Sequence, residues 1–382
     1  MRTYCLLALL WCAPAGAVSL AERVPINPTA WDLYPENLLK SVSRYLASHL
    51  QFSGNSDQSD EQAKGRLNLA GNNVIWSSHD IALDFRDSAS RQDGSDSQTL
   101  VFRYSLPVAG TDFQLAMEDS RHSGVVESAG QQLDALGEYE GLTISGSRSL
   151  WSWQGLQLDS LFSHSKGTSR SFEESMWVSD STHEISRLGV RCSGERELPG
   201  GFMAGSSLTA LGGWETRESL STTGFTSEGN RFHKLALSAS LNRSFYTWDL
   251  GVAGRYQFAP DDLASSEYLQ IAGPSMMKGF NGQSMYVSEG GWVRLNARSP
   301  GYSMPFTDAV NSFLMVSVLK GWASTSGAGQ DRFRASTGEI SLRLQGQGFH
   351  ASMSVGQLLD LSGQAMQRPA SPDISLSMSV GI

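Results

Sequence analysis

Alternation of apolar and polar residues with a period of two is the feature that most constrains the fold of this chain. Near the end, Ile374, Leu376 and Met378 alternate with serines, and the pattern recurs in 113–118 and 248–257. A period of two is typical of a β-strand, whose successive side chains point to opposite faces. About sixteen strand candidates of roughly ten residues each can be marked along the chain. We therefore predict an all-β protein.

Alternation alone does not distinguish a soluble sandwich from a membrane barrel, because an apolar face can pack in a core or against lipid. The lengths of the connections favour the barrel. Short connections alternate strictly with long polar ones, which is typical of outer-membrane barrels with turns at one rim and loops at the other. The short connections are 106–110, 150–153, 198–201, 242–248 and 346–348, and the long polar ones include 53–65, 88–98, 120–139, 165–181, 216–230 and 324–334.

An even number of strands also suits closure, which removes the exposed sheet edges that lipid does not tolerate. We therefore predict a transmembrane antiparallel β-barrel of about sixteen strands. Aromatic residues near strand ends are candidates for interface girdles, with ordinary packing as the alternative. These residues are Trp76, Trp151, Trp153, Trp214, Tyr246 and Trp248.

The first residues have the composition of a secretory signal. Arg2 precedes a short apolar run, and Ala15-Gly16-Ala17 fits a cleavage site, so residues 1–17 are expected to be a signal peptide. Residues 18–45 are expected to be a short N-terminal segment, forming a helix, a small plug or a poorly ordered lead-in. The barrel is expected to occupy residues 46–382 as one domain.

Composition excludes several classes of function. Beyond the predicted signal only Cys192 remains, so no intrachain disulfide is expected, and the net charge of −9 argues against nucleic acid as a partner. The seven histidines show no metal spacing, and Ser163 with Lys166 forms an S-x-x-K match without its partner motifs. We expect no catalytic residues, no metal and no cofactor; a barrel enzyme with a scattered site is the least favoured alternative.

One long polar loop carries the most specific motif, within GPSMMKGFNGQSMYVSEGGWVRLNA at 273–297. This stretch resembles the outer-membrane translocators of two-partner secretion, the haemolysin secretion/activation proteins, which share a superfamily with BamA-type assembly factors. The resemblance implies a sixteen-strand barrel whose loop folds into the lumen with a Val-Arg-Gly-Phe/Tyr motif at its tip. Lys278, Gly279 and Phe280 stand where that motif belongs.

The family's second motif, Gly-Asp-x-Gly-Trp followed by Arg-Asn-Glu, lies on the next strand. Glu289, Gly291, Trp292 and Asn296 occupy its positions here. The likeness extends over 46–382 and is more diffuse in the strands. It implies that Gly279 permits a tight tip, that Phe280 packs on the inner wall, and that Lys278 pairs with a lumen carboxylate, for which Glu289 is the candidate. An ordinary long extracellular loop is the alternative.

The chain also departs from the family pattern. Lys278 replaces the motif arginine and lacks its planar fork, and Ala297 replaces the glutamate after Arg-Asn. No acidic residue lies between Asn311 and Trp322, where the arginine's partner is expected, and the last residue is Ile382. The family places two POTRA domains before the barrel, and 18–45 is too short for one, so we expect this chain to lack them.

The resemblance implies a bacterial outer-membrane protein that exports a polypeptide client. The expected partners are outer-membrane lipid, a secreted protein client and a separate periplasmic capture factor. The alternative is a porin-like or structural barrel without POTRA domains that has lost secretion, which the changes at Lys278 and Ala297 favour.

Overall fold

The computed structural model describes residues 50–59, 62–73, 78–90, 95–128, 131–174, 176–259, 263–304, 307–323, 333–346, 349–363 and 366–381. All of them belong to one compact unit, His49–Ile382. The predicted signal peptide at 1–17 and the N-terminal segment at 18–45 lie outside the described residues, as does the predicted barrel start at residue 46.

The described chain is almost entirely β-strand. The elements that build the wall are β1 (Leu50–Ser59), β2 (Gln62–Asn72), β3 (Asp80–Ser90), β4 (Asp96–Val108), β5 (Thr111–Ser128), β6 (Gln131–Trp153), β7 (Leu156–Glu173), β8 (Met176–Leu198), β9 (Phe202–Ser221), β10 (Gly224–Phe245), β11 (Trp248–Phe258), β14 (Gly290–Arg298), β16 (Thr307–Ala323), β17 (Arg334–Gly346), β18 (Phe349–Ser362) and β19 (Asp373–Gly381). A short 3-10 turn, η1 (Ser265–Glu267), and the strands β12 (Leu269–Ala272), β13 (Met285–Val287) and β15 (Tyr302–Met304) complete the set. None of the helical segments within the described ranges is long and apolar enough to cross a membrane.

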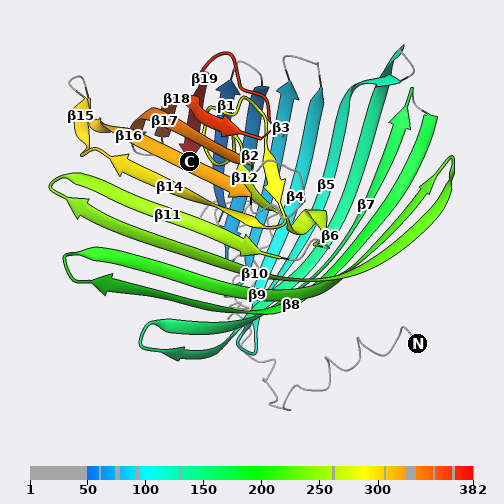
Figure 1. Cartoon of the computed structure of the whole chain (residues 1–382), viewed down its shortest axis with the longest axis horizontal. Helices are drawn as coiled ribbons and strands as arrows, with labels where there is room; N and C mark the ends of the chain where they lie inside the picture. Colours follow the sequence, from blue (N-terminus) through cyan, green and yellow to red (C-terminus); the bar gives the residue numbers. More distant parts are fainter. Residues whose placement is uncertain are drawn as a thin grey trace, which may run out of the picture. The chain divides into compact units, whose positions relative to one another are not determined.

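The wall strands pair in chain order and close into a ring. Each pairs antiparallel with its neighbour from β1 through β11, then β14, β16, β17, β18 and β19. The last strand, β19, then pairs with β1, from Ser53 opposite Gly381 to Ser59 opposite Ser375. Figure 1 shows the red β19 beside the blue β1. The predicted antiparallel barrel of sixteen strands is thus confirmed in the described part of the chain.

Alternate residues on the strands have opposite surroundings. On β17, for example, Ile340 and Leu342 are exposed on one face, whereas Ala335, Thr337 and Ser341 are buried on the other. An exposed apolar face on a closed ring is the arrangement of a barrel wall that contacts lipid. We therefore assign the exposed apolar face to the membrane and the other face to the lumen.

The predicted lengths of strands and loops were wrong on one side of the barrel. The segments 120–139, 165–181 and 216–230, predicted to be long loops, consist largely of continuations of strands β5 to β10. These strands have 18 to 23 residues, about twice the 9–11 that cross a bilayer. Beyond the lipid both faces meet water, so the apolar alternation stops while the backbone pairing continues.

The segments 53–65 and 88–98, which were also predicted to be long loops, consist largely of strand as well. Within 53–65 and 88–98, β1 and β3 extend to Ser59 and Ser90, and β2 and β4 resume at Gln62 and Asp96. For 324–334, residues 324–332 lie outside the described part of the chain.

The connections at the other rim are short, as predicted. The pair Ala109–Gly110 joins β4 to β5, and Gln154–Gly155 joins β6 to β7. All four have positive φ angles, the requirement of a type I′ hairpin turn. The turn predicted at 150–153 is therefore displaced to Gln154–Gly155.

Several of the aromatic candidates stand exposed next to these short turns. The Trp151 and Trp153 rings stack with centroids 6.0 Å apart beside the β6–β7 turn. Tyr246 lies in the β10–β11 turn and Trp248 directly follows that turn, and both are also exposed. These positions suit an interface girdle; Trp76 lies outside the described residues.

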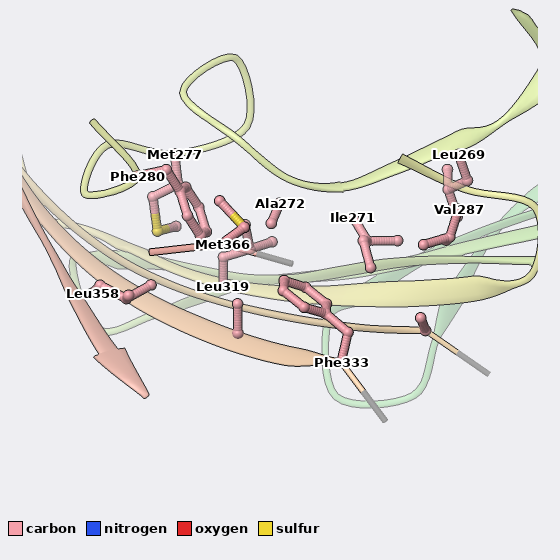
Figure 2. Close-up of a cluster of buried hydrophobic side chains, with 12 residues drawn as sticks. Leu269, Ile271, Ala272, Met277, Phe280, Val287, Leu319, Phe333, Leu358 and Met366 are labelled. Carbon is pink, nitrogen blue, oxygen red and sulfur yellow. The ribbon is translucent and has the colours of Figure 1, made fainter. Parts of the chain in front are cut away.

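The segment between β11 and β14 folds into the barrel, as predicted. We call its described residues, 263–289, the lumen loop. Within it β12 and β13 form a small antiparallel pair. Its side chains form a buried cluster with lumen-facing residues of β16, β17 and β18 (Figure 2). The largest apolar core of the described chain therefore lies inside the barrel, between loop and wall.

Closure of the ring can be tested with a disulfide across the β1–β19 seam. Ser56 lies directly opposite Met378, and paired Cα atoms in antiparallel strands lie within the range that a disulfide bridges. In a background without the native cysteines, we expect S56C/M378C to cross-link on oxidation and to change its mobility in denaturing, non-reducing gels.

The matched control is S56C/L376C, because Leu376 pairs with Gln58 rather than Ser56. This control is expected to cross-link poorly, since diagonal neighbours are about 7–8 Å apart. Equal cross-linking of both pairs would contradict the register, and cross-linking of neither would contradict closure.

Candidate functional site

The tip of the lumen loop is held on the inner wall through its backbone. The Lys278 N–H donates to Glu339 Oε2 on β17 at 2.9 Å, and Thr337 Oγ1, on the same strand, donates to the Lys278 carbonyl at 2.8 Å. The Gly279 N–H donates to Asp373 Oδ2, at the start of β19, at 3.2 Å. Hydrogen bonds from N–H groups to carboxylates are among the stronger ones in proteins. Two carboxylates and one hydroxyl therefore fix the position of two consecutive peptide groups.

Glycine is required on both sides of this contact. Gly279 has φ of +108°, and a Cβ there would lie 2.5 Å from Thr337 Oγ1 and 2.8 Å from the Gln357 N atom. On the wall, a Cβ at Gly356 of β18 would lie 2.3 Å from the carbonyl carbon of Lys278. The loop and wall backbones thus approach more closely than any side chain permits. This geometry accords with the role expected for Gly279.

Apolar packing reinforces the tip. Phe280 is only 1% exposed and belongs to a cluster with Met277 of the loop, Leu319 of β16, Leu358 of β18 and Met366. Figure 2 shows Met277, Phe280 and Met366 close together at the end of the cluster near Leu358. Phe280 therefore lies against wall residues of β16 and β18. Full burial of a phenylalanine side chain contributes about 1.5–3 kcal/mol relative to exposure.

The second motif supports the loop from β14. Asn296 Oδ1 accepts hydrogen bonds from Arg294 Nε and from Ser317 Oγ of β16, each at 2.8 Å. Arg294, so oriented, donates through Nη1 to the Met276 carbonyl at 3.1 Å. Asn296 therefore acts on the loop through Arg294, a residue that the sequence reasoning did not single out.

The other members of this motif lie where β14 begins. Trp292 is partly buried against the cluster that contains Phe280. At Gly291, a Cβ would lie 2.7 Å from the Arg255 carbonyl oxygen of β11. Glu289 accepts a hydrogen bond from the Tyr256 hydroxyl at 3.0 Å. Motif residues thus lie along the path from the second half of the loop into the wall.

The carboxylates at the tip are not the one that the sequence suggested. Glu339 and Asp373 contact the tip backbone, whereas the pairing of Lys278 with Glu289 stays a prediction. The acidic partner was expected between Asn311 and Trp322, which lie on β16, whereas Glu339 lies one strand further, on β17. Its alternation with Thr337 and Ser341, which are buried, assigns it to the lumen face. The odd-numbered position that Glu339 shares with Thr337 and Ser341 was the feature of the sequence that could have identified it as a lumen residue.

The loop is also joined to the segment between β18 and β19. Gln283 Nε2 donates to the Gln367 carbonyl at 3.0 Å, and the Gln367 N–H donates to Gln283 Oε1 at 2.8 Å. Asn281 Nδ2 also donates to the Ser371 carbonyl at 3.4 Å. The reciprocal amide pair resembles a short stretch of sheet ladder and connects the far side of the tip to the rim.

A second anchor holds the beginning of the loop against other strands. Glu267 of η1 is 7% exposed and forms ion pairs with Arg187 of β8 and with Lys234 Nζ of β10, the latter at 2.7 Å. Gln257 Nε2 of β11 donates to the Glu267 carbonyl at 3.0 Å. Beside it, Leu263 packs in a small cluster with wall residues of β8 and β10. We call the contacts of Glu267 the base anchor and those of Lys278–Phe280 the tip anchor.

The two anchors differ in energetic character. Removing one partner of a buried ion pair costs about 3–5 kcal/mol, because a charge is left uncompensated. Of the hydrogen bonds of the tip, the one from Thr337 contributes about 0.5–1.5 kcal/mol net, and those to the Glu339 and Asp373 carboxylates contribute about 1.5–3 kcal/mol each. Each single contact of the tip is therefore weaker than the ion-pair anchor, and the contacts can be released one at a time.

Substitution of Gly279 by alanine is expected to release the tip. The added Cβ meets wall atoms at 2.5–2.9 Å, and the positive φ adds about 1–3 kcal/mol of strain. In the native protein both peptide groups of Lys278 are engaged, so trypsin should cut poorly after it. In G279A trypsin should cut after Lys278 about tenfold faster or more. The rate of this cut is measured by mass spectrometry of the fragment that ends at Lys278.

Gly301 provides the matched control, because a Cβ there meets only Asn311 Cβ at 3.9 Å. G301A should leave the cut after Lys278 as slow as in the native protein. An equally slow cut in G279A would contradict the tight docking of the tip.

Substitution of Glu267 by glutamine is expected to loosen the base anchor. It leaves Arg187 and Lys234 without their carboxylate, and Lys234 is only 10% exposed. Amide hydrogen exchange of residues 263–272 should become about tenfold faster or more. E228Q, an equal charge change at an exposed site on β10, should have no such effect. Native-like exchange in E267Q would show that the ion pairs do not hold the loop.

Comparison with known proteins agrees with this architecture. CdiB from Acinetobacter baumannii superposes with a TM-score of 0.69 at 16% identity, covering 87% of this chain and 60% of that one. CdiB from Escherichia coli gives 0.65 at 15% identity, covering 87% and 63%. The chain thus spans less than two thirds of either protein, and at these identities the likeness concerns the fold. Among curated proteins, no sequence matches.

A family match covers most of the sequence. The model of the haemolysin secretion/activation proteins ShlB/FhaC/HecB matches residues 41–328, which include the strands β1 to β16 and the whole lumen loop. The chain therefore belongs to the haemolysin secretion/activation protein family ShlB/FhaC/HecB and is an outer-membrane β-barrel.

Proposed function

We propose that this chain is a translocator that passes a polypeptide client through the outer membrane, with the lumen loop as its gate. The observation that carries the proposal is the docking of Lys278–Phe280 on the lumen wall by a few individually weak contacts. A structural plug has no need of a releasable tip. A gate needs a closed state that is well defined and an opening cost of only a few kcal/mol.

The partners follow from this proposal. The client is a secreted polypeptide that crosses in an unfolded or extended form and draws its driving force from folding outside. Outer-membrane lipid surrounds the wall, and a separate periplasmic factor captures the client. No step of this process requires a catalytic residue, a metal or a cofactor, and we propose that the chain is not an enzyme.

A porin-like barrel without secretion activity is the second candidate. It is favoured by Lys278 and Ala297, which replace the arginine and glutamate of the family motifs. Lysine keeps the charge but loses the bidentate geometry of arginine. The two candidates differ in whether the closed state is released by a client.

Removal of the tip should convert a closed channel into an open one. The deletion of 274–284 leaves β12 and β13 in place and removes Lys278–Phe280. In planar bilayers the native protein should be closed for most of the recording, whereas the deletion variant should conduct steadily. Controls are G279A, expected to open intermittently, and G301A, expected to match the native protein. A native protein that conducts steadily would support the porin-like alternative.

The secretion role requires a cellular measurement as well. Deletion of the gene should remove one secreted or surface polypeptide from the exoproteome, and the native gene should restore it. An unchanged exoproteome would contradict the translocator, whatever the conductance of the purified barrel.

A further inference from the structure

A cluster of arginines surrounds one carboxylate on the wall formed by β2, β3 and β4. Asp84 of β3 is contacted by Arg66 of β2, by Arg86 Nε at 3.1 Å and by Arg103 Nη1 of β4 at 4.0 Å. Arg86 Nη2 also lies 3.4 Å from Asp84 Oδ2. Three guanidinium groups from three adjacent strands thus converge on a single acid.

The cluster faces the lumen. On the same strands Leu67, Leu83 and Leu100 are exposed and belong to the apolar face that contacts lipid. Arg66 and Asp84 are next to Leu67 and Leu83 in the sequence, so their side chains lie on the opposite face. Across the strands, Arg66 is paired with Arg86, and Asp84 is paired with Val101. Period-two alternation therefore directs the charged groups inward.

Asp84 organises the cluster but does not neutralise it. Its side chain is 0% exposed, whereas those of Arg66, Arg86 and Arg103 are 48%, 49% and 35% exposed. The two oxygens of one carboxylate can accept hydrogen bonds from only some of the N–H groups of three guanidinium groups. The remaining N–H groups are held in place and meet the water of the lumen.

The neighbouring lumen-facing groups leave the wall positive. Lys64 lies on the face of Arg66, and Glu118 of β5 lies opposite Val101. Asp80 lies four residues from Asp84, toward the rim with short turns. Among the nearest groups whose side chains the structure describes there are four cations and two carboxylates; Asp80 lies further away, and Asp57 of β1 is paired opposite Lys64 in the strand register.

The lumen loop leaves this wall accessible. Its base anchor and tip anchor contact β8, β10, β11, β16, β17, β18 and β19. The half-exposed arginines are on strands that precede all of these. A chain passing the loop would meet this wall.

We propose that Arg66, Arg86 and Arg103 form an anion-binding wall that holds carboxylate-bearing segments of a polypeptide in the lumen. Guanidinium forks bind carboxylates in a bidentate manner, and their positive field raises the local concentration of anions. Positive side chains that line a pore favour anions in the same way. The polypeptide part rests on the proposed function, whereas the anion preference does not.

The test uses the open channel that lacks 274–284, with R86Q/R103Q introduced and Arg66 kept as the close partner of Asp84. In planar bilayers under a KCl gradient, the parent should prefer chloride and the double variant should lose that preference. A ten-residue glutamate peptide should reside in the parent about tenfold longer than in the variant. A ten-residue lysine peptide should not show this loss.

The matched control is K166Q/R170Q. Ser163 and Ser165 of β7 contact Arg187 on the lumen side, so Lys166 and Arg170 alternate with them on the outer face. This control removes the same charge and should change neither chloride preference nor peptide residence. If the double variant does not assemble, the single variant R103Q is used in its place, because Arg103 has the longest contact with Asp84, at 4.0 Å.

The outcomes separate the two proposals. Unchanged selectivity and residence in R86Q/R103Q, or an equal loss in K166Q/R170Q, would overturn the anion-binding wall. Loss of chloride preference with unchanged residence of the glutamate peptide would overturn its role toward polypeptides. An unchanged exoproteome on gene deletion, with both effects present, would overturn secretion and leave the anion-binding wall intact.

Discussion

The hydrogen-bonding demand of a backbone in lipid is the constraint on which the rest of this structure depends. A sheet in hydrocarbon cannot leave an edge unpaired, so β19 must return to β1, as their register from Ser53 to Ser59 shows. Closure in turn gives every strand one face toward lipid and one face toward a wet interior. Apolar residues such as Ile340 and Leu342 are therefore exposed, and the interior receives the small and polar residues. A polar loop such as 263–289 can lie inside only because closure has already made that interior polar.

The tip docks in the wet lumen mainly through its backbone. Two of its contacts use the N–H and C=O groups of Lys278, which any residue except proline supplies in full. What the position demands instead is the absence of side chains at Gly279 and Gly356, where the backbones approach most closely. Gly279 and Gly356 are thus constrained by sterics rather than by a side-chain contact. A lumen full of water also lets each broken hydrogen bond re-form with solvent, which keeps the net strength of the tip modest.

The sequence predicted those parts of the structure that follow from local chemistry. Alternation in segments such as 374–382 identified strands, and the resemblance identified Gly279 and Phe280, whose places in the tip follow from backbone freedom and apolar burial. The extent of β5 to β10 was missed because strands outside lipid carry polar residues on both faces, and that composition resembles a loop. Glu339 and Asp373 were missed for another reason. They lie 61 and 94 residues from their partners in the tip, and only the register of a closed ring brings them there.

The unequal strength of the two anchors suggests the order of events when the lumen opens. The base anchor buries an acid between Arg187 and Lys234, and separating them leaves charges without compensation. The tip can exchange its hydrogen bonds for water one at a time, and it also loses the packing of Phe280. The tip should therefore leave first while η1 stays on β8 and β10, so that the loop swings about Glu267 rather than leaving the barrel. Such a swing widens the lumen beside β16 to β19, next to the seam with β1 and the arginine wall of β2 to β4.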